Sequence, residues 1–89
     1  MEKKYFADVY FYTCPKCRRQ VIGKNYYCLF ELAEMGAAKR AGLITYTCTH
    51  EDCHASYPSD RLLTNGEAVE VSAKEVLSNG LVFESKGQA

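Results

Sequence analysis

Five cysteines in a chain of 89 residues are the side chains most able to do chemistry, and four of them fall into two close pairs. The pairs are Cys14 with Cys17 and Cys48 with Cys53. Thiolates held this close together in short turns are the preferred ligands of a structural Zn²⁺ ion, which they surround as a tetrahedron. We therefore predict one structural zinc ion bound by Cys14, Cys17, Cys48 and Cys53.

Two other uses of paired cysteines are less well supported by the sequence. Disulfide bonds form in oxidising compartments, but the first residues of the chain reach an acid before any signal-peptide apolar core could form, so we expect a cytoplasmic protein. A redox Cys-x-x-Cys pair lies next to a β-α-β pattern, and none surrounds Cys14 and Cys17. Four protein ligands leave the metal no open position for a substrate, so we expect no catalytic residues and no enzyme activity.

The remaining cysteine and the two histidines are expected outside the ligand set. Cys28 lies among apolar neighbours, where a small apolar residue in a packed face explains it best. His50 and His54 are close enough to the second pair for either to replace a cysteine, but four thiolates already complete a closed site. We predict that both histidines lie on the surface or beside the ligands.

Length and composition indicate one small folded domain. Apolar residues make up 47% of the chain and charged residues 25%, with a formal net charge of zero. Such a chain is too apolar to be disordered and too balanced in charge to be a polybasic nucleic-acid arm. No apolar run reaches the roughly 18 residues that a membrane span needs, so we expect no membrane association. We predict a single zinc-ribbon domain over residues 1–84 and a disordered tail over 85–89.

The hydrophobic pattern around the two pairs predicts strands that lead into each of them. Residues 5–13 alternate as a strand that is covered on both faces, and 43–48 form another strand that enters the second pair. Residues 20–22 predict a short strand. Between the pairs, Asn25 as N-cap, basic residues in the last turn and a glycine stop predict a helix over 26–41.

The segment after the second pair is expected to be a small β/α extension. Residues 57–63 predict a turn and 68–71 a strand, followed by a capping box that opens a short helix over 72–78. A hairpin across Asn79-Gly80 is the competing interpretation. The predicted fold class is thus α+β: a small zinc ribbon with two cysteine knuckles on β-strands, a helix inserted between the knuckles, and this C-terminal extension.

Two surfaces of the predicted fold could bind a partner. A basic cluster around the first pair offers contacts to nucleic-acid phosphates or to an acidic protein surface, or it only offsets the charge of the thiolates. Its members are Lys16, Arg18, Arg19 and Lys24. The predicted helix offers an apolar stripe on which a partner helix could dock. The members of this stripe are Leu29, Leu32, Ala33, Gly36 and Ala37.

The cysteine pairs and their surroundings resemble a known family. The run Cys14-Pro15-Lys16-Cys17, together with the second pair between Tyr46 and Tyr57, is similar in order to the Ogr/Delta family of small phage zinc-finger activators of late transcription. The resemblance covers residues 14–57, and the segment between the pairs is longer here than in that family. It implies a phage-type regulatory protein that acts in the bacterial host cell by binding RNA polymerase or promoter DNA. The alternative is a zinc-stabilised protein-interaction module that inhibits or adapts a host complex without touching nucleic acid.

Overall fold

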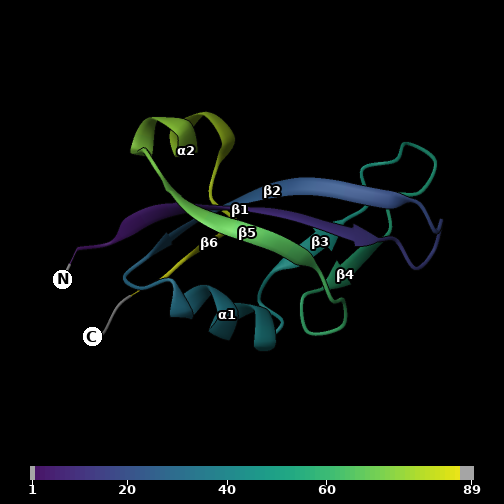
Figure 1. Cartoon of the computed structure of the whole chain (residues 1–89), viewed down its shortest axis with the longest axis horizontal. Coiled ribbons are helices and arrows are strands. Elements are labelled where there is room, and N and C mark those ends of the chain that lie inside the picture. The colour runs from purple at the N-terminus through teal and green to yellow at the C-terminus, as the bar shows by residue number, and fades with distance from the viewer. Residues whose placement is uncertain (1, 87–89) are drawn as a thin grey trace.

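The computed structural model describes residues 2–86, which form six strands and two helices. The chain begins with a long β-hairpin, continues through a short helix and a smaller hairpin, and returns to the first sheet at its end (Figure 1). The elements are β1 (Lys4–Thr13), β2 (Gln20–Leu29), α1 (Ala33–Arg40), β3 (Thr45–Thr47), β4 (Ser56–Pro58), β5 (Asn65–Val71), α2 (Ala73–Asn79) and β6 (Phe83–Glu84). This is the α+β class that the sequence predicted.

A four-stranded sheet in the order β5-β1-β2-β6 forms the body of the molecule, and β3 and β4 form a separate two-stranded sheet. β1 and β2 pair antiparallel along their whole length, from Lys4 opposite Leu29 to Thr13 opposite Gln20. β5 pairs antiparallel with the other edge of β1, and β6 runs parallel to β2. Over the residues described, neither helix is long and apolar enough to cross a membrane.

The predicted helix over 26–41 is wrong in its first part. Residues up to Leu29 continue β2, and α1 starts only at Ala33. The apolar residues of this stretch fit both periods, but Val21, Tyr27 and Leu29 are fully buried and share one face of β2 in its pairing with β1. Ten cross-strand pairs with β1 outweigh the local helix signal, because tertiary pairing overrides weak propensities.

α1 is held at both ends by its own sequence. At its start, the Glu34 carboxylate accepts hydrogen bonds from the backbone N–H groups of Phe30 and Glu31, at 2.7 and 2.8 Å. After its end, Gly42 adopts a φ of 74°, a conformation that favours glycine, so the predicted glycine stop is confirmed.

The core lies between the large sheet, the β3–β4 hairpin and α1. On the sheet side it consists of residues from β1 and β2, namely Phe6, Tyr10, Tyr12, Val21, Tyr27 and Leu29. Tyr46 of β3 meets the Tyr10 ring edge-on, with 4.8 Å between the ring centroids. Gly23 is required opposite Tyr10, because a Cβ there would lie 2.4 Å from the Tyr10 hydroxyl oxygen. Lys39 of α1 adds an ion pair with the buried Asp8 carboxylate, 2.7 Å from Nζ to Oδ2.

The opposite face of the sheet is only partly covered, so the prediction that both faces of the first strand are covered is wrong for part of its length. α2 places Val76 over Ala7 and Tyr26 at one end of this face. Toward the other end, Val9 and Phe11 stay exposed. The reason is length: α2 is a helix of seven residues and cannot shield the whole length of a ten-residue strand.

The C-terminal extension matches the prediction up to α2. The predicted strand over 68–71 lies within β5. Ser72 caps α2 by accepting the N–H of Glu75, which confirms the capping box. The competing hairpin at the end of α2 is wrong, because β6 lies parallel to β2 and not beside β5.

The predicted tail over 85–89 begins as packed chain. Ser85 is buried, and its N–H donates to the Cys28 carbonyl oxygen at 2.8 Å. Its hydroxyl donates to the Glu34 carboxylate, which ties the end of the chain to the start of α1. Residues 87–89 lie outside the described residues.

Candidate metal centre

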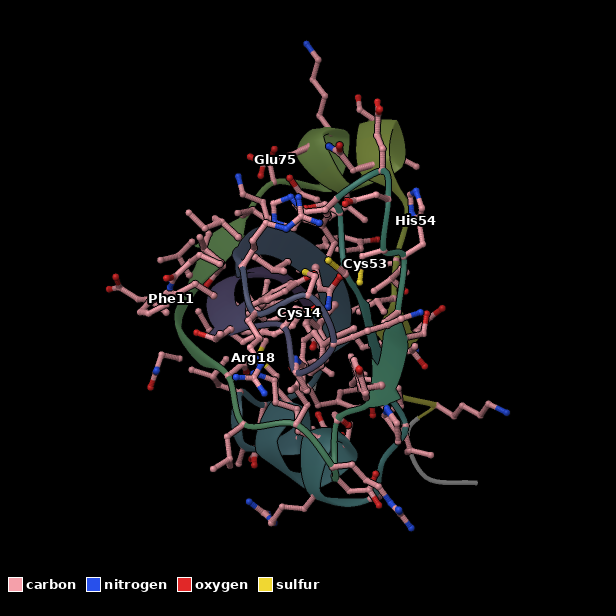
Figure 2. The ribbon with its side chains drawn as sticks, turned by 90° about the vertical axis from the view of Figure 1, so that its right-hand side faces the viewer. Phe11, Cys14, Arg18, Cys53, His54 and Glu75 are labelled. Carbon is pink, nitrogen blue, oxygen red and sulfur yellow. The ribbon has the colours of Figure 1, made fainter. Side chains whose placement is uncertain are left out.

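The two cysteine pairs lie in the loops of the two hairpins, so each pair forms the tip of a β-ribbon. Cys14 and Cys17 lie between β1 and β2, and Cys48 and Cys53 lie between β3 and β4. β4 takes up the start of the predicted turn over 57–63 and completes the second ribbon. Figure 2 looks onto this end of the molecule, where sulfur atoms gather between the labels of Cys14 and Cys53.

The four thiols meet closely enough to bind one metal ion. Their sulfur atoms all lie within 4.8 Å of one another. Two separations that cross from one hairpin to the other, Cys14 to Cys53 and Cys17 to Cys48, are each 3.7 Å between Sγ atoms. A tetrahedral Zn²⁺ with Zn–S bonds of about 2.3 Å requires sulfur separations of about 3.8 Å. The donor set and its spacing therefore fit one structural zinc ion.

The four cysteines differ in how far they are buried. Cys14 and Cys48 are fully buried, while Cys17 and Cys53 are partly exposed at the rim. Each hairpin thus contributes one inner and one outer ligand. Because all four ligands are protein thiols, the bound zinc serves to clamp the two hairpins together.

Both tips are shaped by a residue in the left-handed backbone region directly after the second cysteine of the pair. Arg18 has a φ of 62° and His54 a φ of 53°. The Arg18 N–H donates to the Cys14 carbonyl oxygen at 2.8 Å, and the His54 N–H donates to that of His50 at 3.3 Å. A non-glycine residue in this region costs about 1–2 kcal/mol, so metal binding has to hold both turns against their local preference.

The pKa values of Cys17 and Cys48 shift in opposite directions, because a backbone N–H acts on one thiol and burial acts on the other. The backbone N–H of Arg19, followed by its guanidinium, lowers the pKa of Cys17 to about 6. Burial raises the pKa of Cys48 to about 12. The surroundings of Cys17 therefore favour a thiolate and those of Cys48 oppose one, and a divalent cation is what allows Cys48 to bind as a thiolate.

The other candidate ligands lie outside the sulfur cluster. His50 Nε2 lies 3.0 Å from the Gln20 carbonyl oxygen and so ties the second tip to the start of β2. His54 is exposed and lies to one side of the sulfur atoms in Figure 2. Cys28 is buried as expected, but in β2 and not in a helix.

Two of the four basic residues predicted as a contact surface are paired with acidic side chains. Arg19 pairs with Asp52 of the second tip, and Lys24 pairs with a glutamate of α2, farther along the sheet. In the part of the chain that the structure describes, Lys16 and Arg18 are the two that make no ion pair. The cations near the metal are thus partly neutralised by acids that the sequence pattern did not link to them.

The apolar stripe predicted on the helix is not a single surface. Leu29 is fully buried at the end of β2. α1 itself turns Met35 and Ala38 into the core, and it leaves Ala33 and Ala37 exposed. The error arises because the helix was predicted to begin at residue 26, so residues of β2 were counted with the helix and the wrong face of α1 was taken as the apolar stripe.

An exposed apolar surface on the sheet was missed by the sequence analysis. Val9, Phe11, Ile22 and Val69 lie on the face that α2 leaves open, with 40, 43, 69 and 47% of their surfaces exposed. We call these four residues the open sheet face. The alternation of β1 places Val9 and Phe11 on one face and so could have indicated two of the four residues. Only the pairing of β1 with β2 and β5 brings Ile22 and Val69 beside them.

No protein-family model, curated protein or solved structure matches this chain. The zinc-ribbon class therefore rests on the four thiols at the tips of two hairpins. The resemblance to the Ogr/Delta family stays a prediction, and function has to be argued from the surfaces of the molecule.

Proposed function

We propose that this protein is a zinc-stabilised protein-interaction module. The observation that carries the proposal is the open sheet face, a contiguous set of exposed apolar side chains on one sheet. Soluble proteins rarely leave such patches exposed unless they bind something. Phe11 and Ile22 lie opposite each other next to the zinc-bearing hairpin tip, so metal binding makes the surface rigid and lowers the entropy lost on association.

Promoter DNA is less well supported than protein as the partner. A DNA-binding surface needs several available cations to replace counterions at the phosphates. Arg19 and Lys24 are engaged with acidic side chains. A zinc ion with four thiolates adds about two negative charges to a chain whose formal net charge is zero. These charges favour a module that contacts a host protein complex without nucleic acid.

RNA polymerase remains a candidate partner within this proposal. The resemblance to the Ogr/Delta activators implies contact with the host transcription machinery, and contact with the polymerase itself is a protein contact. The support for it is the order of the two cysteine pairs and their flanking aromatic residues. In this proposal the zinc is structural and the protein acts by binding and not by catalysis, because four thiolates leave no position for a substrate.

A pull-down from bacterial lysate, analysed by mass spectrometry, tests the proposal. The wild-type protein should retain a protein partner, and Ile22→Thr/Val69→Thr should lose it, because threonine keeps the strand propensity while making the open sheet face polar. Leu63→Thr is the matched control, since Leu63 is 96% exposed and lies outside that face. Equal capture by the wild type and the double variant would contradict the proposal.

DNA binding is measured in parallel. The wild type should show little affinity for double-stranded DNA at moderate salt. Affinity that falls steeply with salt, and that is lost in Lys16→Ala/Arg18→Ala, would instead support the DNA-binding hypothesis.

A further inference from the structure

The outer side of β5 is an open strand edge. β5 is the last strand on its side of the four-stranded sheet, and no segment among the described residues pairs with its outer side. Five of its seven residues are exposed. An edge of this kind offers unpaired backbone groups to a further strand, so its exposure calls for an explanation.

The hydrogen-bond registers show which backbone groups of β5 face outward. The Tyr26 carbonyl oxygen accepts a hydrogen bond from the Val82 N–H, just before β6. The backbone N–H and C=O groups of Tyr26 therefore point away from β1, and those of Tyr27 point toward β1. Backbone direction alternates along antiparallel strands. The register of β2 with β1 shows which β1 residues bond to β2, and the remaining β1 residues bond to β5. In β5, the N–H and C=O groups of Gly66, Ala68 and Glu70 therefore point away from the sheet.

A shallow groove of about 680 Å³ lies on the sheet surface beside this edge. Its lining consists of Val9, Phe11, Asn65, Gly66, Glu67 and Val69. Phe11 projects from the body of the molecule in Figure 2. Gly66 is required here, because a Cβ at this position would lie 2.3 Å from the Val9 carbonyl oxygen. The side chains on one face of an added strand would enter this groove and contact its apolar lining.

The charges along β5 select the kind of strand that can be added. Glu67 and Glu70 are both exposed, and the ion pair of Glu70 with Lys4 is long, at 4.0 Å. A second copy pairing through β5 would place the glutamates of both copies along one short seam, where like charges repel. A segment that carries lysine or arginine between apolar residues satisfies both the acidic edge and the groove.

We propose that the β5 edge accepts an extended peptide segment that alternates apolar residues with lysine or arginine, and that this segment adds one strand to the sheet. Its backbone pairs with Gly66, Ala68 and Glu70, and its apolar side chains enter the groove beside Val69. Its cations lie on the other face of the added strand, near Glu70, while Glu67 lies at the rim of the groove. This inference rests on the proposed function and names the chemistry of the partner: a basic, extended segment of another protein.

The probe for this site is a short fluorescein-labelled peptide that alternates valine with lysine. It is titrated with the zinc-loaded full chain, and binding is followed by fluorescence anisotropy. Saturable binding that weakens as salt rises is expected. Two control peptides, one with glutamate in place of lysine and one with methylated backbone nitrogens, should bind at least about tenfold more weakly, since each lacks the charges or the donors that the edge requires.

Variants of the protein test the edge directly. Ala68→Pro removes an outward N–H without removing a bond to β1, a position where edge strands tolerate proline, and should weaken binding by about tenfold or more. Leu63→Thr, at an exposed position outside the sheet, is the control and should bind as the wild type does. Glu67→Lys/Glu70→Lys should weaken binding at low salt, which gives a readout that needs no proline.

Several results would overturn the proposal. The wild type could fail to bind the valine–lysine peptide, the control peptides could bind equally well, or a zinc-loaded Ala68→Pro could bind unchanged. Self-association that Ala68→Pro abolishes, measured by sedimentation, would assign the edge to a second copy and overturn it as well. A pull-down that still depends on Ile22 and Val69, in a protein that ignores the peptide, would refute strand addition and leave the proposed function standing.

Discussion

Cys48 and Cys28 are a natural matched pair for testing the metal centre. Both side chains are buried, with 0 and 5% of their surfaces exposed. Only Cys48 belongs to the sulfur cluster. Replacing either with alanine removes the same single atom from a packed environment, so any difference between the two variants reports on metal binding.

The structure sets the expected size of that difference. Cys28→Ala loses the burial of one sulfur atom, and we expect a loss of about 1–2 kcal/mol in the free energy of unfolding. Cys48→Ala also loses one of four ligands. Structural zinc binds such domains with about 10–16 kcal/mol, and one quarter of that is about 2.5–4 kcal/mol, or about a hundredfold to a thousandfold in zinc affinity. A domain this small lies near the lower end of the usual range, at about 5 kcal/mol, so a combined loss of about 3.5–6 kcal/mol should leave this variant largely unfolded.

Elemental analysis after dialysis against a chelator measures the bound zinc, and circular dichroism follows thermal unfolding. Cys28→Ala should keep one zinc per chain and a cooperative transition, whereas Cys48→Ala should lose both. His50→Ala and His54→Ala should behave as Cys28→Ala does. The reasoning is refuted if Cys48→Ala keeps zinc at wild-type affinity, or if the reduced wild type holds no zinc and forms two disulfides.

The remaining predictions concern an ion pair, a backbone strain and a titration. Lys39→Met should lower the free energy of unfolding by about 3 kcal/mol in urea, because it leaves the buried Asp8 carboxylate unpaired, and Asp8→Leu/Lys39→Met should recover part of the loss; full additivity would contradict this. Arg18→Gly should raise the thermal midpoint, since relief of about 1–2 kcal/mol of left-handed strain exceeds the roughly 0.5–1 kcal/mol that the freedom of glycine costs, and a lower midpoint would count against that account. The Ser85 hydroxyl and backbone N–H groups hold the pKa of Glu34 below its usual value, so the stability from this carboxylate is present above about pH 4.3 and is lost as pH falls through the folded-state pKa. Glu34→Gln should therefore lose less stability than the wild type between about pH 5 and about pH 3, and parallel urea curves would exclude the effect.

The metal ligands were predictable because each pair is a local feature. Cys14 and Cys17 lie in one turn, and Cys48 and Cys53 lie in another, and each turn is closed by its own backbone hydrogen bonds. Four thiols of this spacing in so short a chain favour one shared ion. The capping box at Ser72 was predictable for the same reason, since its hydrogen bond spans three residues.

The start of β2 was predicted as a strand over 20–22, but its continuation to Leu29 was not predictable by the same means. Residues 26–29 carry aromatic and apolar side chains that suit either a helix or a strand, and a local capping signal at Asn25 favoured the helix. Pairing with β1 decided the outcome, because it gives every residue from Gln20 to Leu29 a cross-strand partner. The misplaced docking stripe on the helix followed directly from that decision.

The sequence by itself determined the metal, its four ligands and the α+β class, because these depend on residue types and on spacings of a few positions. The tertiary structure decided which surfaces are available for binding. Val9, Ile22 and Val69 belong to three different strands and become neighbours only through the sheet registers. Arg19 is neutralised by Asp52 only because both hairpin tips meet at one metal centre. Contacts between residues distant in the chain depend on the closed fold, and no local pattern encodes them.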